Sequence, residues 1–317
     1  MKKYLLLILI PLFFFSCGQG NVKSNPDSKE IDSTAQSAVQ EVKKRPESPK
    51  IKSITRYKTS PEDAEGSILS TENYDENGLR TEYLGYDYYG SGEQTDKTTF
   101  EYDDKGQKIK SVQESSGQVT TETYTYDEEG KESGQAWSRP DGKGASESNV
   151  YNAQGDVQET KYYDVDGKYD FSRVYEYTYD QAGNITEEKK WEKYTDGSAD
   201  LLMYHQSKTY NAEGKVLSET DHRGDGAISG KDVIAYDAQG NMVEKIEYAS
   251  DESVDSREVS EYNEYGELIK DQAFSGMDVL NYTNTYTYDE YGHQLSMMYK
   301  HEDGEAWGER TVYTYYE

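Results

Sequence analysis

The sequence has little of what usually builds a compact core or a membrane span. The 301 residues after Ser16 include only 38 Leu, Ile, Val and Phe, and the whole chain carries a net charge of −28. That combination is typical of disordered chains. A single cysteine excludes a disulfide scaffold, and the lack of long apolar runs after residue 15 excludes a polytopic membrane protein. With 34 basic against 62 acidic residues, the surface repels phosphate, so nucleic-acid binding is excluded.

Tyrosine is what the sequence has in excess, with 32 residues in the chain. Aromatic side chains favour strands and bury a large area each, so they replace the missing aliphatic residues. We therefore expect a folded, all-β protein rather than a disordered one.

The N-terminus predicts secretion and lipidation. Two lysines precede an apolar run from Leu5 to Phe15, which is too short to span a bilayer stably, and Ser16-Cys17 follows. This junction resembles the lipobox of bacterial lipoproteins, which implies that residues 1–16 are a signal peptide and that Cys17 is lipidated. The alternative is a plain secretory signal with an incidental cysteine. The lipid anchor implies a cell-envelope location, at either face of the outer membrane.

Residues 17–49 are rich in Ser, Asn, Gln, Lys, Glu and Pro and are nearly free of apolar residues. This composition predicts a flexible tether. Residues 50–317 then form the repeat domain, and residues 51–58 are expected to be its opening strand.

The repeat is the pattern Tyr-(Asp/Asn)-x-x-Gly, which recurs nine times at steps of 24 to 31 residues and twice more out of step, starting at Tyr86 and Tyr163. Asp or Asn favours a type I turn, and Gly supplies the positive φ that returns the chain to a strand. We call the nine in-step segments the main turns. Their tyrosines and glycines are Tyr74 and Gly78, Tyr102 and Gly106, Tyr126 and Gly130, Tyr151 and Gly155, Tyr179 and Gly183, Tyr210 and Gly214, Tyr236 and Gly240, Tyr262 and Gly266, and Tyr288 and Gly292.

Further turn-like segments lie between the main turns, such as Asp225-Gly226, or after the last of them, such as Asp303-Gly304. We call them the intervening turns. Each repeat therefore contains two turns and two strands, and alternation such as Tyr175-Glu176-Tyr177 places the tyrosines on one face. The predicted fold is an elongated, curled antiparallel β-strip of about ten hairpin repeats of about 26 residues, or about twenty strands.

The segment Tyr177–Ile185, with its pattern Tyr-x-Tyr-Asp-x-x-Gly-Asn-hydrophobic, resembles the YD repeat of Rhs and teneurin-type proteins. The resemblance runs from Tyr74 to the C-terminus and implies a β-strip. Large members of that family wrap their strip into a hollow shell. We expect some ten hairpins to be too few to close such a shell. We find no Asp-Pro-rich self-cleavage core and no toxin domain in the printed sequence, so we expect the strip without toxin delivery.

No residue pattern predicts an enzyme or a cofactor. Carboxylate pairs are unavoidable with 62 acids, and the four histidines lack ligand spacing, so we interpret them as exposed loop residues. The segment from Asp221 to Asp232 partly resembles an EF-hand loop, which makes Asp221, Asp225 and Asp232 weak metal candidates. Arg223 occupies a ligand position there, and a long hairpin turn is the favoured interpretation.

The three tryptophans, Trp137, Trp191 and Trp307, fall near the intervening turns. Aromatic side chains at hairpin ends could stack on sugar rings, or they could cap the tyrosine rows at the sheet edge. The function we expect is that of a non-enzymatic cell-envelope lipoprotein, a repeat scaffold that binds glycan or protein partners. The alternatives are a carbohydrate-active enzyme or its accessory module, and a relative of the Rhs shell proteins without a toxin.

Overall fold

The structure, a computed structural model, describes residues 42–87 and 92–317. The predicted signal peptide, Cys17 and tether residues 17–41 lie outside the described residues. Within the described ranges the chain forms twenty strands and no helix. These residues therefore contain no membrane-spanning helix. The all-β class is confirmed.

The strands follow the repeat, two to each hairpin unit. They are β1 Ile51–Thr59, β2 Ser67–Tyr74, β3 Arg80–Tyr86, β4 Gln94–Tyr102, β5 Lys108–Ser115, β6 Gln118–Tyr126, β7 Glu132–Ser138, β8 Ser146–Tyr151, β9 Val157–Tyr163, β10 Tyr169–Tyr179, β11 Ile185–Tyr194, β12 Leu201–Tyr210, β13 Val216–His222, β14 Ile228–Tyr236, β15 Met242–Ala249, β16 Val254–Tyr262, β17 Leu268–Ser275, β18 Val279–Tyr288, β19 Gln294–His301 and β20 Ala306–Tyr315.

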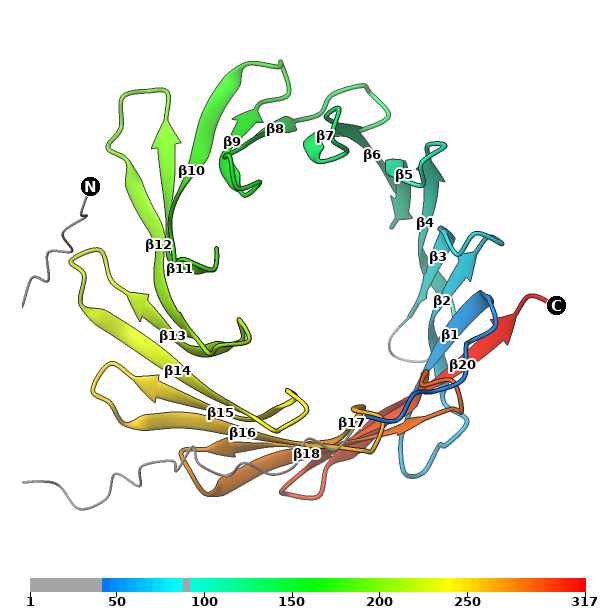
Figure 1. Cartoon of the computed structure of the whole chain (residues 1–317). Coiled ribbons are helices and arrows are strands. Elements are labelled where there is room, and N and C mark those ends of the chain that lie inside the picture. Colours follow the sequence, from blue (N-terminus) through cyan, green and yellow to red (C-terminus); the bar gives the residue numbers. More distant parts are fainter. Residues whose placement is uncertain (1–41, 88–91) are drawn as a thin grey trace, which may run out of the picture. The chain divides into compact units, whose positions relative to one another are not determined.

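The sheet is closed, which corrects the expectation of an elongated strip. Each strand pairs antiparallel with its neighbours in sequence, and β1 also pairs with β20, from Ile51 opposite Tyr315 to Thr59 opposite Gly308. Figure 1 shows the strands following one another around a ring, with the blue β1 beside the red β20. Closure gives the two end strands partners for their backbone groups, which an open strip would leave exposed at both edges.

The main turns share one hydrogen-bond pattern. In all nine, the side-chain oxygen of the Asp or Asn accepts hydrogen bonds from the backbone N–H groups two and four residues later, as Asp75 does from Asn77 and Leu79. The turn glycines have φ between 77° and 93°, a range that costs other residues energy. Because the strands are antiparallel, all nine main turns lie at one rim of the closed sheet, which we call the main rim. The intervening turns lie at the opposite rim.

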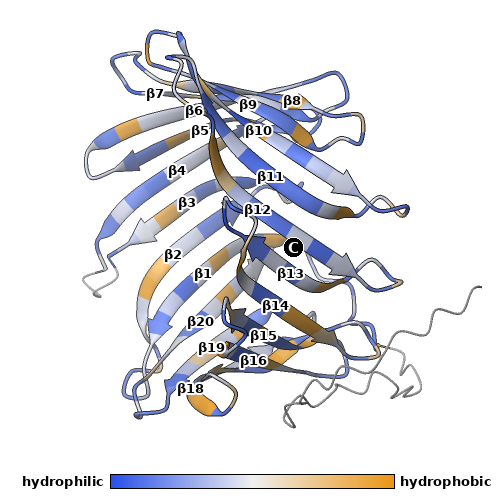
Figure 2. Ribbon diagram, turned by 90° about the vertical axis from the view of Figure 1, so that its left-hand side faces the viewer, coloured by the Kyte–Doolittle hydropathy of each residue, from blue (hydrophilic) through white to orange (hydrophobic). Residues whose placement is uncertain are grey.

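The sheet has almost no apolar core. Among the described residues, only Tyr124, Ile246 and Ala273 are buried hydrophobic side chains. Figure 2 shows short hydrophobic segments scattered over largely hydrophilic strands. The stability of the fold must therefore come largely from the backbone ladder and from polar and aromatic contacts between adjacent strands.

Residues 42–50, which we call the strap, run along the main rim before β1 begins. The sequence predicted a flexible tether as far as residue 49. In the structure, the backbone N–H of Lys43 donates to the carbonyl oxygen of Glu264. The backbone N–H of Tyr316 donates to the carbonyl oxygen of Lys50. The end of the predicted tether therefore packs on the repeat domain.

Candidate binding surfaces

A ladder of tyrosine hydroxyl groups crosses the sheet beside the main rim. Nine hydroxyls, one near the end of each even-numbered strand from β4 to β20, each donate to the carbonyl oxygen of the first residue of the preceding strand, at 2.6–3.1 Å. The donors are Tyr102, Tyr126, Tyr151, Tyr177, Tyr210, Tyr236, Tyr262, Tyr288 and Tyr313. We call the face that carries them the tyrosine face. Seven of the nine donors are main-turn tyrosines.

The two other main-turn tyrosines bond differently. The Tyr74 hydroxyl donates to Glu72, and burial together with this bond raises the pKa of Tyr74 to about 12. The Tyr179 hydroxyl donates to Asp156. At the closure, Tyr316 donates to the carbonyl oxygen of Tyr74 at 2.6 Å, so the set of tyrosine contacts continues across the junction of β1 and β20.

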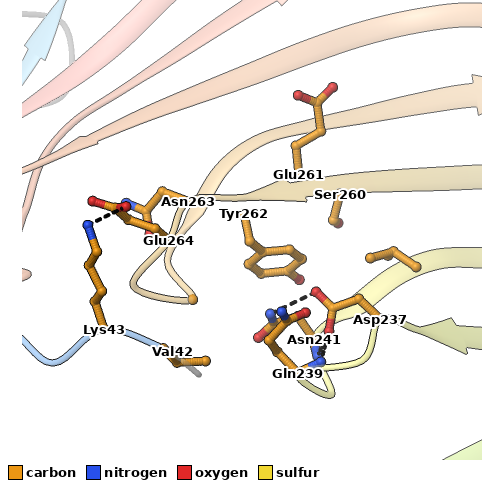
Figure 3. Close-up of a pocket in the computed structure, with 12 residues that line it drawn as sticks. Val42, Lys43, Asp237, Gln239, Asn241, Ser260, Glu261, Tyr262, Asn263 and Glu264 are labelled. Carbon is orange, nitrogen blue, oxygen red and sulfur yellow. Dashed lines mark hydrogen bonds and ion pairs between the residues drawn. The ribbon is translucent and has the colours of Figure 1, made fainter. Parts of the chain in front are cut away.

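Open grooves lie between successive main turns. One of about 590 Å³ is bounded by the turns at residues 237–241 and 263–266 and by Val42 and Lys43 of the strap. Figure 3 shows Tyr262 and Asn241 in this groove, with Lys43 reaching Glu264 at its edge. A similar groove of about 540 Å³ lies between the turns at residues 180–184 and 210–214. The repeat thus produces comparable open grooves, lined by polar and apolar groups, at separate positions along the rim.

The strap is held to the main rim by charge and by an aromatic ring. The guanidinium of Arg45 donates to both carboxylate oxygens of Glu267, at 3.0 and 2.8 Å, and lies 3.8 Å from the ring centroid of Tyr265. The ammonium of Lys43 lies 2.6 Å from the carboxylate of Glu264. The bond to Arg45 holds the pKa of Glu267 below its ordinary value, against the opposing effect of burial. Sequence reasoning missed these contacts because the strap's composition indicated only a linker.

The three tryptophans do not form one surface. Trp307 in β20 stacks on Tyr299 of β19, with ring centroids 5.4 Å apart, and Tyr299 contacts Tyr282 of β18 at 5.3 Å. Tyr299 covers one face of the Trp307 ring, so Trp307 belongs to an aromatic row that crosses three strands. Trp191 in β11 has a buried indole nitrogen without a hydrogen-bond partner in the described part of the chain. Trp137 in β7 lines an open groove of about 360 Å³ near Arg139 and Asp141.

A second aromatic row lies on the tyrosine face and was not predicted. Tyr162, Phe171 and Tyr194 come from β9, β10 and β11, with centroids 4.4 and 6.2 Å apart. The Arg173 guanidinium lies 4.9 Å from the centroid of Tyr162 and donates to its hydroxyl. The alternation of residues along each strand indicated that these aromatic side chains share one face. It did not show that Phe171 lies opposite both Tyr162 and Tyr194, which depends on the strand register.

The structure does not bring the weak metal candidates together. Asp221 accepts a hydrogen bond from Gln206, Asp225 accepts from the backbone of Ala227, and Asp232 pairs with Lys245. Residues 223–226 form a tight turn between β13 and β14. Among residues 42–87 and 92–317, no group of three or more His, Cys, Asp or Glu side chains is arranged to hold a metal.

The interpretation of the histidines as exposed loop residues is wrong for His205 and His293, whereas His301, at the end of β19, is 38% exposed. His205 lies within β12, its side chain is 14% exposed, and its Nε2 lies 2.8 Å from Glu187. Its ring stacks at 4.4 Å on that of His222, whose Nε2 lies 2.9 Å from the Ser207 hydroxyl. His293 packs beside Tyr313 and contacts Asp289. The contacts of His205 and His222 join residues 15 to 18 positions apart in the sequence and form only when the strands pair, which concealed them. The contact of His293 with Asp289, in contrast, lies within one main turn.

No protein-family model matches the chain, and no curated protein matches it. Among solved structures, a chain of the TcdB2-TccC3-Cdc42 crystal structure is 16% identical with a TM-score of 0.33, and the match covers 74% of this chain and 14% of that one. A porin-like protein from Bacteroides uniformis ATCC 8492 is 13% identical with a TM-score of 0.36, over 85% of this chain and 99% of that one. The chain thus spans about a seventh of the TcdB2-TccC3 chain. Membership of the YD-repeat family stays a prediction.

Proposed function

We propose that this protein is a non-enzymatic cell-envelope lipoprotein whose closed repeat sheet binds a partner protein. The observation that carries the proposal is the main rim, where nine turns of the same hydrogen-bond geometry stand side by side. A repeated surface adds similar small contacts, so affinity grows through their number rather than through one deep pocket. The grooves between the turns are open and suit a chain or a loop better than an enclosed small molecule.

The lipid anchor is the part of the proposal that places the protein in the envelope. It rests on Ser16-Cys17 after the apolar run of the N-terminus. Acylation of Cys17 with two or three chains would anchor the protein stably, whereas one chain would be marginal.

The test combines fractionation with cross-linking. The wild-type protein and the Cys17→Ser variant are expressed with a C-terminal tag, labelled with a fatty-acid analogue and separated into membrane and soluble fractions. We expect the variant to lose the label and leave the membrane pellet. Cross-linking in intact cells should then capture the same partner repeatedly through main-rim residues. Cross-links spread evenly over both rims would contradict a binding role for the main rim.

A glycan is the second candidate partner, and Trp137 is the observation that favours it. Trp137 lines the groove of about 360 Å³ beside Arg139 and Asp141, and no aromatic stacking contact to its ring occurs in the described ranges. Titration with envelope oligosaccharides should change the tryptophan fluorescence of the wild type and not that of Trp137→Phe. An unchanged wild-type signal would remove this candidate.

A further inference from the structure

The residue that follows the Asp or Asn of each main turn divides the main rim into two parts. It is acidic in five turns and Ala or Gln in the other four. The acidic residues are Glu76, Asp104, Glu128, Glu264 and Glu290, and the others are Ala153, Gln181, Ala212 and Ala238. Because β20 pairs with β1, the five acidic turns are consecutive on the rim, from the β16–β17 turn across the closure to the β6–β7 turn. We call this stretch the acidic arc.

The chain's own strap occupies the first part of the acidic arc. Lys43 pairs with Glu264, and Arg45 pairs with Glu267 beside the following turn. The ammonium of Lys50 donates to the carbonyl oxygen of Glu76 at 2.7 Å, in the turn beyond the closure. A basic segment of the chain itself therefore already lies along this part of the main rim. Its cations bind the carboxylates and a backbone carbonyl oxygen of the acidic turns.

The strap also matches the spacing of the turns. Val42 lies 3.6 Å from the position of a Cβ on Gly266, and Arg45 lies 3.6 Å from that of a Cβ on Gly292. Three residues of strap thus span one repeat. Three residues of extended chain cover about 10 Å, and two strand spacings cover about 9.6 Å, so an extended chain stays in register with successive turns.

The remaining turns of the arc, at residues 103–107 and 127–131, are not covered by the strap. The side chains of Asp104, Glu128 and Glu129 are exposed, and none of them forms an ion pair within the described ranges. Lys105 and Lys131 are the basic residues of these turns, so acidic groups remain in excess in each. These carboxylates offer the same type of contact that Glu264 offers to Lys43.

We propose that the uncovered part of the acidic arc binds an extended basic segment of a partner protein, with Lys or Arg at about every third position. This inference rests on the proposed binding function and names the chemistry of the partner. The partner segment continues the track of the strap, and its cations pair with the carboxylates of Asp104, Glu128 and Glu129. Exposed pairs are individually weak, so the affinity depends on several of them and falls as salt rises.

The test measures peptide binding to the full chain by fluorescence anisotropy. The labelled peptide contains four repeats of Arg-Ser-Ser, and its isomer has the same composition with the four arginines consecutive. The triple variant Asp104→Asn, Glu128→Gln, Glu129→Gln removes the uncovered carboxylates. Its control, Asp166→Asn, Glu252→Gln, Glu302→Gln, makes the same charge change in exposed turns of the opposite rim. Circular dichroism checks that both variants fold.

We expect the arc variant to bind the spaced peptide about tenfold more weakly than wild type, the control within about twofold of wild type, and the isomer more weakly than the spaced peptide. Equal losses in the two variants would mean binding by overall charge and would overturn the inference. So would a loss confined to Glu264→Gln, Glu267→Gln, which would place the peptide on the strap's own site. If in-cell cross-links to a partner persist in the arc variant, the inference fails while the proposed function stands.

Discussion

The hydroxyl of Tyr262, at the end of β16, donates a hydrogen bond of 2.8 Å to the carbonyl oxygen of Met242, the first residue of β15. The bond ties the end of one strand to the exit of the preceding main turn. The same relationship recurs eight more times around the sheet, so the tyrosines replace with polar contacts part of what an apolar core would supply.

Removing this hydroxyl should destabilise the sheet locally. We expect Tyr262→Phe to lower the free energy of unfolding by about 1 kcal/mol, because the bond is lost while the ring packing is kept. Tyr248→Phe in β15 is the matched control, since no hydrogen bond to its hydroxyl occurs in the described part of the chain. Urea unfolding compares the two variants, and equal losses would contradict a specific role for the ladder.

The turn glycines should be sensitive to substitution because of their backbone conformation. Gly183 has φ of 90° and nothing within 4 Å of an added Cβ, so Gly183→Ala tests the conformation alone. We expect a loss of about 1–2 kcal/mol. Gly224 also has free space for a Cβ but no positive φ, and Gly224→Ala should be nearly neutral. A neutral Gly183→Ala in thermal melts would show that this turn adopts another conformation.

The tyrosines should make the fold sensitive to alkali. Burial, aided by Glu72, raises the pKa of Tyr74 to about 12, and burial also raises the pKa of Tyr102, Tyr126 and Tyr288. A folded-state pKa above the unfolded value of about 10 means that the stabilisation is complete below pH 10 and is lost as pH rises towards 12. Absorbance at 295 nm and circular dichroism should therefore change together. Full tyrosine ionisation near pH 10 with an unchanged dichroism spectrum would contradict this.

Net charge should make the fold more stable in physiological salt than in dilute buffer. With 62 acidic and 34 basic residues, repulsion remains after all pairing, and it is screened as the Debye length falls from about 30 Å at 0.01 M to about 8 Å at 0.15 M. Melting temperatures at fixed pH across this range provide the measurement. A lower melting temperature in salt would mean that the ion pairs outweigh the repulsion.

Ion pairs between glutamates and nearby basic side chains reduce that repulsion, and the sequence did not reveal them. Four glutamates recur four or five residues after a turn glycine, which on a strip suggests a row of like charges. In the structure each has a basic partner at 2.6–3.6 Å: Glu159 with Lys161, Glu187 with Lys189, Glu219 with Lys208 and Glu244 with Arg257. Two of these partners lie on an adjacent strand, and cross-strand register cannot be read from the repeat alone.

The local structure was predictable because it depends on neighbouring residues. The Tyr-(Asp/Asn)-x-x-Gly pattern marks each turn, and period-two alternation marks the strands and their tyrosine face. Contacts between distant segments were not predictable. Three examples are the pairing of Thr55 with Val312, the ion pair of Arg45 with Glu267 and the stacking of His205 on His222. These contacts depend on the twist and the register of the strands, which the repeat pattern does not specify.

The central claim is that the sheet closes between β1 and β20, and a disulfide tests it most directly. Thr55 and Val312 are opposite partners in this pairing. Opposite residues of antiparallel strands have Cα atoms about 4.5–5.5 Å apart, within disulfide range. In a Cys17→Ser background, Thr55→Cys with Val312→Cys should form an intramolecular disulfide under mild oxidation, whereas Thr55→Cys with Thr178→Cys on β10 should not. Free thiols or only intermolecular disulfides in the first variant would show an open strip.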